Sequence, residues 1–191
     1  MISPVTGNID GEMRILGKNN QVTDVVGSVK GRQIGIRGVV VDTAKANFTH
    51  ADNSTNMTVV GTIGDGALSG YGYIQNGNID ATISGNALPL TALSLIIGQD
   101  VDGTLNTSFA IKGIVDNPNV TGTVWGQEVH YKGARFNNIH GDIKLDNHIL
   151  TITNGHIGDG DGGYDVNGWY NLNTDVLDLN AKARAARIEN V

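Results

Sequence analysis

The chain has 191 residues, of which 27 are glycine and none is cysteine, and its formal charge is -6. This length fits one domain or one part of a longer repeat protein, and the absence of cysteine excludes a disulfide framework and a cysteine-ligated metal site. An acidic chain without a basic stripe argues against nucleic-acid binding, and no apolar run approaches the length of about 18 residues that crosses a bilayer.

Apolar and polar residues alternate with a period of two along most of the chain. The first run is Ile9, Gly11, Met13 and Ile15, and later runs occupy 57–63, 79–83, 101–111, 120–124, 139–145, 164–172 and 177–183. This alternation is typical of strands with one apolar and one solvated face. Turn signals rich in Gly, Asn and Asp separate the runs at 64–66, 76–78, 116–118, 146–147 and 158–163. The sequence therefore predicts an all-β antiparallel meander.

One segment departs from the strand pattern. Leu90, Leu93 and Ile97 recur at helical spacing, and Pro89 precedes them while Gly98 follows. Proline in the first turn and glycine just past the end are the usual limits of a helix. We predict one short helix at about 89–97.

Two parts of the sequence look like copies of one unit. Asp52-Asn53 and, after seven residues, 61–66 match Asp146-Asn147 and, after seven residues, 155–160. Residues 4–9 similarly echo 118–124. Repeats that cannot bury their apolar face alone stack into elongated structures. We therefore expect two units, 1–117 and 118–191, in one continuous domain that is a piece of a longer chain, the first unit being longer by an insertion near 18–41.

Each sequence feature that could indicate catalysis or metal binding has a simpler structural explanation. The acidic run 158–163 lacks the Gly and Glu positions of an EF-hand loop and is typical of a hairpin turn. His130, His140 and His156 take the polar side of the alternation, where solvated histidines are expected rather than a metal site. The sequence has no cysteine nucleophile and no Gly-x-Ser-x-Gly elbow. We expect no enzyme activity, no metal and no cofactor.

The second half of the chain carries several weak motifs in a characteristic order. After the expected helix come Val101-x-Gly103-x-Leu105 and the segment IKGIVDNPNVTG at 111–122. They are followed by A-x-F-x-N-I-x-G-x-I-x-L at 134–145, N-x-I-L-x-I at 147–152, a Gly-Asp-Gly turn and Val166-x-Gly168. From about Leu88 onward this order resembles the AsmA-like superfamily, in particular the C-terminal region of its TamB branch of translocation and assembly module proteins.

The resemblance implies a long sheet curled into a half-pipe, or β-taco, with an apolar concave groove and a polar convex face. Members of this family are anchored in the inner membrane, cross the periplasm of diderm bacteria and meet an outer-membrane barrel protein. They are implicated in phospholipid transport to the outer membrane and in outer-membrane protein assembly. The implied function is a periplasmic segment that shields phospholipid acyl chains. An inner-membrane anchor and a terminal barrel-binding element are not recognised in this sequence, so those two properties are not transferred.

In this interpretation function is collective, and no residue is catalytic. The helix residues Leu90, Leu93 and Ile97 are expected to pack into the groove or cap it. The expected lining of the groove is Ile63, Ile79, Ile83, Val101, Leu105, Phe109, Ile111, Val124, Ile139, Ile143, Leu145, Leu150, Ile152, Val166, Leu172, Leu177 and Leu179.

Two other hypotheses fit the composition. A structural or adhesive β-solenoid rich in Gly and Asn would hide its apolar face inside a closed coil, although the irregular unit length argues against it. A scaffold for unfolded outer-membrane strands would instead use the exposed edges of an open sheet.

Overall fold

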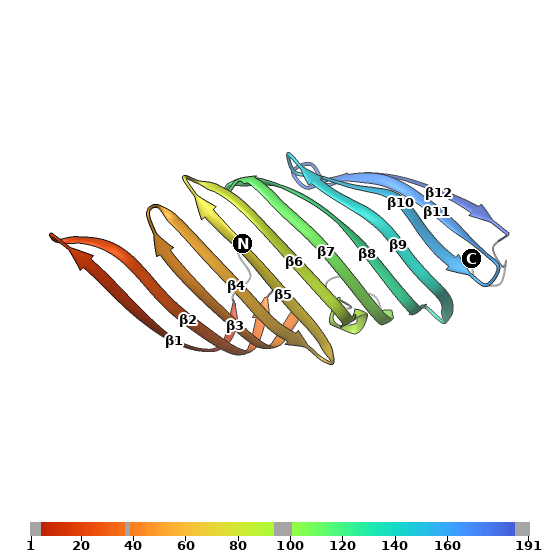
Figure 1. The fold of residues 1–191 in the computed structure, drawn as a ribbon. Coiled ribbons are helices and arrows are strands. Elements are labelled where there is room, and N and C mark those ends of the chain that lie inside the picture. The colour runs from red at the N-terminus through yellow and green to blue at the C-terminus, as the bar shows by residue number, and fades with distance from the viewer. Residues whose placement is uncertain (1–4, 37–38, 94–100, 186–191) are drawn as a thin grey trace.

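The computed structural model describes residues 5–36, 39–93 and 101–185. These residues form one 12-stranded sheet in which the spatial order of the strands is their order in the sequence (Figure 1). Its strands are β1 (Thr6–Lys18), β2 (Gln21–Ile36), β3 (Val39–Ala51), β4 (Ser54–Ile63), β5 (Gly66–Gln75), β6 (Asn78–Pro89), β7 (Val101–Ile114), β8 (Asn117–Tyr131), β9 (Ala134–Asp146), β10 (Ile149–Asp159), β11 (Gly162–Asn171) and β12 (Val176–Arg184). Each strand pairs antiparallel with the next, which confirms the predicted all-β meander.

Most connections between strands are short hairpin turns that match their sequence, whereas β6 and β7 are joined by the longer segment 90–100. In five of the hairpin turns both central residues have positive φ, the conformation of type I′ turns, whose twist suits adjacent antiparallel strands. Asn and Gly adopt this conformation readily, which explains why they recur between the strands. The five pairs are Asn19-Asn20, Asp52-Asn53, Asn76-Gly77, Lys132-Gly133 and Asn147-His148.

Bulges interrupt the ladder at several strands. In β6 the register shifts between Gly85 and Leu88, and Ala87 lies in the left-handed region with φ 48°. The amide that this bulge frees is not left unpaired, because Ala87 N donates to Asn106 Oδ1 at 2.8 Å. In β10 the bulge at Asn154 is held in the same way, by a 3.0 Å hydrogen bond to Asn167 Oδ1. Bulges of this kind bend a strand and increase its twist.

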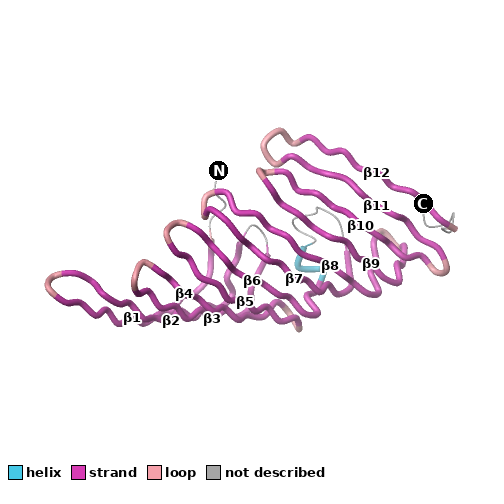
Figure 2. The backbone as a smooth tube through the Cα atoms, turned by 45° about the horizontal axis from the view of Figure 1, so that its top comes forward, coloured by secondary structure: helices cyan, strands magenta, loops and turns pink. Residues whose placement is uncertain are grey.

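The sheet is open, and the described residues form no second layer over it. The strands are bent, and the sheet is curled (Figures 1 and 2). β1 and β12 are separate edges, which is incompatible with the closed coil of a solenoid. The accessible surface is 12609 Å², whereas a compact monomer of 20.1 kDa would expose about 8,700 Å². Much of the apolar side chain area therefore has no protein cover.

The predicted helix is not confirmed. The structure describes one 3-10 turn, η1 (Leu90–Leu93), and places Pro89 at the end of β6. The side chain of Leu93 and all of Ile97 lie outside the described residues. η1 packs on β7 and also contacts β6 and β3. In the described part of the chain no helix is long and apolar enough to cross a membrane.

The expected division at 117/118 falls at the beginning of β8, and the sheet continues across it without a break. The repeat signal marks equivalent hairpins on either side of this point. Asp52-Asn53 turns the chain into β4, and Asn147-His148 turns it into β10. β10 contains a bulge that β4 lacks. The turns that follow β4 and β10 therefore do not fall at equivalent positions of the sequence repeat.

Candidate functional site

The pairing register assigns the side chains to two faces, because directly paired residues lie on the same side of a sheet. Two rows of directly paired residues run across the whole sheet, each with one residue from every strand. The Ile143 row is Gly11, Val29, Ala46, Val59, Gly70, Ile83, Phe109, Gly122, Ile143, Ile152, Gly168 and Leu179. The Leu145 row is Met13, Gly27, Phe48, Met57, Gly72, Ala81, Ile111, Val120, Leu145, Leu150, Tyr170 and Leu177.

These two rows contain no charged residue, and their only polar side-chain group is the hydroxyl of Tyr170. We call the side of the sheet that carries them the apolar face. The row that alternates between them points to the other side and is mostly polar; we call that side the polar face. This intervening row is Glu12, Ser28, Asn47, Thr58, Tyr71, Thr82, Ala110, Thr121, Lys144, Thr151, Trp169 and Asp178.

Most of the residues predicted to line a groove lie on the apolar face. Nine belong to the two rows, namely Ile83, Phe109, Ile111, Ile143, Leu145, Leu150, Ile152, Leu177 and Leu179. Six others lie on this face in the same strands, outside the two rows. They are Ile63, Ile79, Leu105, Val124, Ile139 and Val166.

Of the remaining predicted lining positions, Leu172 lies off this face. Leu172 is in the turn between β11 and β12, because the side chain of Asn171 accepts hydrogen bonds from the next backbone amides and ends the strand. Leu90 and Val101 are buried with Val129 in a small cluster at the ends of β7 and β8. Leu105 and Ile139 of the apolar face pack against this cluster, and η1, which carries Leu90, also contacts β3. This cluster supplies the only buried hydrophobic side chains among the described residues.

The two faces differ in burial although the part of the chain that the structure describes forms no layer over either face. In β5, Leu68 and Ile74 of the apolar face are partly buried, whereas Tyr71 and Tyr73 on the polar face are exposed. β8 shows the same alternation. In β1 and β12, at the edges, both faces are exposed. Partial burial of one face in the central strands is what curvature toward that face produces.

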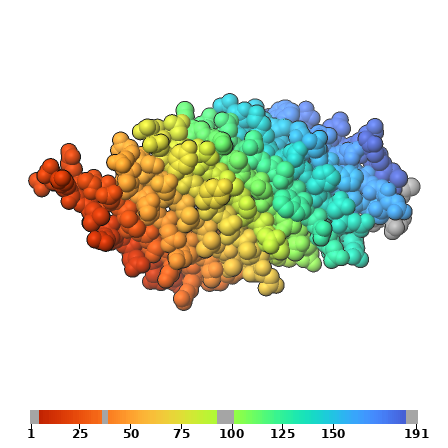
Figure 3. All heavy atoms as spheres, in the orientation of Figure 1, coloured from red at the N-terminus to blue at the C-terminus, as the bar shows by residue number. Residues whose placement is uncertain are grey.

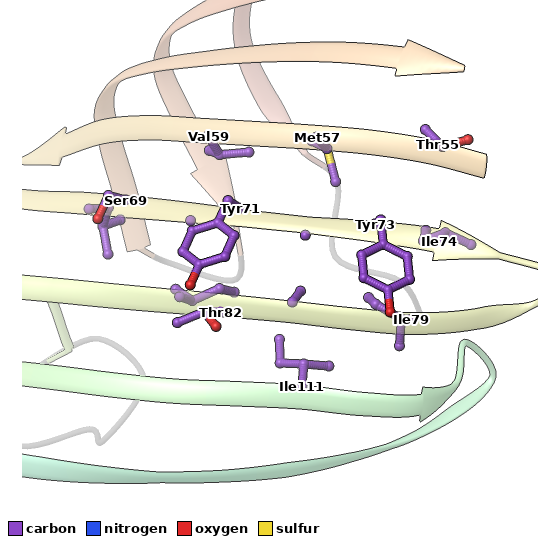
Figure 4. Close-up of a pocket in the computed structure, with 15 residues that line it drawn as sticks. Thr55, Met57, Val59, Ser69, Tyr71, Tyr73, Ile74, Ile79, Thr82 and Ile111 are labelled. Carbon is purple, nitrogen blue, oxygen red and sulfur yellow. The ribbon is translucent and has the colours of Figure 1, made fainter. Parts of the chain in front are cut away.

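The apolar face is hollowed between β4 and β7, in a depression of about 330 Å³ (Figure 4). Met57 and Val59 contribute from β4, and Ile83 from β6, while Gly70 and Gly72 line it from β5. A Cβ at Gly72 would collide with the Cβ of Ala81 on the paired strand. Small residues therefore set the depth of the depression.

His140, His156 and both tryptophans lie on the polar face, whereas His50 has the parity of Phe48 on the apolar face and His148 is in a turn. The rings of His140 and His156 lie 5.4 Å apart across β9 and β10. His156 Nδ1 is 3.2 Å from Asp165 Oδ1, and Arg184 Nε is 2.6 Å from Asp165 Oδ2. The His156 hydrogen bond and the Arg184 charge lower the pKa of Asp165 below its ordinary value. In the described ranges no group of three or more metal-binding side chains forms a site.

Sequence reasoning missed the contributions of β2, β3 and β5 to the apolar face. Glycine and alanine occupy many of the inward positions there, for example Gly27 in β2, Ala46 in β3 and Gly72 in β5. These residues carry little hydrophobic signal, so the alternation in those strands is weak. The available signal was the alternation of Gly70 and Gly72 with Tyr71 and Tyr73 in β5.

Comparisons with known proteins identify no relative. No protein-family model matches the sequence. No curated protein matches it at a significant level, and the same is true of the solved structures. The resemblance to the AsmA-like superfamily therefore depends on the motifs in the sequence, and the function drawn from it is a proposal.

Proposed function

We propose that this chain is a segment of a periplasm-spanning bridge, and that its apolar face shields acyl chains during phospholipid transport to the outer membrane. The observation that carries the proposal is the apolar face itself, which crosses every strand without a charged residue in the Ile143 and Leu145 rows. Within 5–36, 39–93 and 101–185, no protein layer covers this face and explains it as a core.

The energetics favour a continuous apolar path for the acyl chain along the Ile143 and Leu145 rows, which we call the lane. Each methylene that leaves water requires about 0.8 kcal/mol of apolar replacement, so a sixteen-carbon chain requires about 12 kcal/mol. Strands spaced about 4.8 Å apart give the rows a length of roughly 50 Å. A charged side chain within this length would leave part of the acyl chain without apolar contact and create a barrier to its movement. Neither row contains a charged residue.

The proposed shape is a half-pipe with the apolar face on its concave side. The partial burial of Leu68 and Ile74, the exposure of Tyr71 on the other side, and the depression between β4 and β7 support it. The polar face would then meet the aqueous periplasm. In cells we propose that the parent protein is anchored in the inner membrane and connects to an outer-membrane barrel protein, as the resemblance implies, with a secondary link to outer-membrane protein assembly.

The experiment is a lipid-binding measurement on the purified chain. Native mass spectrometry with extraction of bound lipid is combined with titration of a fluorescent fatty acid. We expect bound phospholipid in the wild type and a loss of fatty-acid affinity of at least about tenfold when Ile143→Asp places a carboxylate in the lane.

Matched controls distinguish the effect of placing a charge on the apolar face from the effect of adding that charge anywhere on the sheet. Thr121→Asp adds the same charge to the polar face of the neighbouring strand, opposite Lys144, and should leave binding unchanged. Leu145→Arg on the apolar face and Thr153→Arg on the polar face, opposite Asp142, form a second pair. A folded Ile143→Asp variant that binds and transfers lipid like Thr121→Asp would refute the proposal, as would a wild type that takes up no fatty acid.

A further inference from the structure

Trp125 lies on the polar face of β8, and all of its neighbours on that face are polar. Its side chain is 43% exposed. The pairing register surrounds it with two residues of β8 itself and with three residues on each of the flanking strands β7 and β9. None of them is lysine or arginine. We call Trp125 and these neighbours the Trp125 patch; the neighbours are Thr104, Asn106, Ser108, Thr123, Gln127, Asn138, His140 and Asp142.

The other tryptophan of the chain has different surroundings. Trp169 lies on the same face and is 37% exposed. Ile149 and Val176 are its diagonal neighbours on β10 and β12, which is within reach of an aromatic side chain. Apolar packing therefore accounts for Trp169 but not for Trp125. An exposed indole ringed by hydrogen-bonding groups suits a ligand that has both apolar and polar surface.

A hollow of about 470 Å³ adjoins the Trp125 patch on the polar face of β9, β10 and β11. His140 belongs to both the patch and the hollow. The other residues that line the hollow are Asn154, Gly155, His156, Asp165 and Asn167. The molecule is elongated in the direction that crosses its strands (Figure 3). A ligand that extends from Trp125 into the hollow would therefore lie along the long axis of the molecule.

Hydrogen bonds fix several polar groups of this region before any ligand arrives. Asn154 Nδ2 donates to Asp142 Oδ2 at 2.7 Å, which connects the hollow to the Trp125 patch. The backbone amide of Asn154 donates to Asn167 Oδ1 at 3.0 Å within the bulge of β10. Within the described ranges the side chains of Thr123 and Gln127 have no hydrogen-bond partner, so they can contact a ligand. Groups that are already ordered lose less conformational freedom on binding.

We propose that the Trp125 patch and the adjoining hollow bind a neutral saccharide. A pyranose ring presents C–H groups that stack on an indole, and its hydroxyl groups both donate to and accept from amide and hydroxyl side chains. The patch has no lysine or arginine, and Asp142 repels anions, which argues against a phosphate, a nucleic acid or an acidic sugar. This site lies on the face opposite the lane and is independent of the proposed lipid transport.

The test uses the two tryptophans of the full chain as separate reporters. Trp169→Phe leaves Trp125 as the only indole, and Trp125→Phe leaves Trp169. Both variants and the wild type are titrated with cellotetraose, maltotetraose and the tetrasaccharide of N-acetylglucosamine, followed by fluorescence and calorimetry. We expect a neutral tetrasaccharide to change the fluorescence of Trp169→Phe and to leave that of Trp125→Phe unchanged. Tetragalacturonate, which carries a carboxylate on every ring, should bind at least about tenfold more weakly.

Alanine variants test the contribution of the indole to affinity. Trp125→Ala should weaken saccharide binding at least about tenfold, because it removes the stacking surface. Trp125→Phe retains an aromatic ring and should keep most of the affinity, which distinguishes loss of stacking from misfolding. Trp169→Ala on the polar face and Ile143→Asp on the apolar face should bind saccharide like the wild type. The Ile143→Asp result makes failure of this proposal distinguishable from failure of the lipid proposal.

Three results would overturn the proposal. The first is a wild type that binds none of the neutral tetrasaccharides at millimolar concentration. The second is a folded Trp125→Ala variant with unchanged affinity. The third is a fluorescence response that comes from Trp169 instead of Trp125, since it would place the saccharide elsewhere on the sheet.

Discussion

Replacement of Ile83 by aspartate separates the stability of the free sheet from its capacity to hold an acyl chain. Ile83 lies in the Ile143 row, between Gly70 and Phe109, and lines the depression on the apolar face. Its side chain is 40% exposed in the free protein. A charge at this position can therefore reach water when no lipid is bound, but not when a chain lies over it.

The expected cost in the free protein is moderate. Full burial of an isoleucine side chain contributes about 1.5–3 kcal/mol, and this position retains a little over half of that burial. Removing it costs about 1–2 kcal/mol, and the poor strand propensity of aspartate adds up to about 1 kcal/mol. We expect Ile83→Asp to lower the free energy of unfolding by about 1–3 kcal/mol, less than the cost of a charge in a closed core.

Bound lipid should enlarge the difference in unfolding free energy between the wild type and Ile83→Asp. At a ligand concentration of 100 times its dissociation constant, binding stabilises the native protein by about 2.7 kcal/mol. If the carboxylate weakens binding about 20-fold, the same concentration adds only about 1 kcal/mol. Urea unfolding followed by tryptophan fluorescence, with and without lysophospholipid below its micellar concentration, measures both terms. Thr82→Asp, one residue away on the polar face, is the matched control.

Two results would contradict this reasoning. A loss above about 4 kcal/mol in the lipid-free protein would show that Ile83 is covered, as in a closed core or a face-to-face dimer. Equal stabilisation of Ile83→Asp and Thr82→Asp by lysophospholipid would show that the lipid does not lie on the apolar face.

Two further predictions concern ionisable groups at the C-terminal strands. The lowered pKa of Asp165, which accepts from His156 and pairs with Arg184, means that its carboxylate stabilises the fold above its unfolded pKa and that this contribution is lost on acidification below about pH 4. Asp165→Asn should flatten this acid limb in urea unfolding at several pH values, and an unchanged limb would contradict the assignment. The 2.6 Å hydrogen bond that Tyr170 donates to Asp175 raises the pKa of the phenol, so its contribution is complete below about pH 10 and is lost as the tyrosine ionises. In an ultraviolet titration Asp175→Asn should shift one tyrosine to lower pH, and identical titration curves would exclude the bond in solution.

The sequence predicts the fold class well because strand periodicity and turn chemistry agree with each other. The Asn-Gly turn at Asn76 and the Asp-Asn turn at Asp52 lie where the structure turns. The helix at 89–97 stays a prediction, because the structure describes only its first part, as the 3-10 turn Leu90–Leu93. Leu90 contributes there to the small cluster with Val101 and Val129.

Side-chain faces were predictable only where alternation is uninterrupted. Parity counting through β9 places Ile139 and Ile143 correctly on the apolar face. Counting past Tyr170 fails at Leu172, since the chain has already entered the turn. Bulges cause the other difficulty, because a residue such as Ala87 with positive φ changes the parity of the residues after it in the strand, and nothing in its sequence announces the change.

The glycines of the apolar face have a structural consequence that links composition to the proposed function. Large side chains lie over glycines on the paired strand: a Cβ at Gly27 would stand 2.8 Å from Phe48 Cε1, and one at Gly126 would stand 2.9 Å from Ile139 Cγ1. Such positions allow a ring or branched chain to lie along the sheet. Side chains that lie flat leave low relief and expose the sides of their carbon atoms. A second sheet would need side chains that project and interdigitate in order to pack. A flexible acyl chain needs only a smooth apolar floor, so the glycine content favours a mobile lipid over a protein layer as the cover of this face.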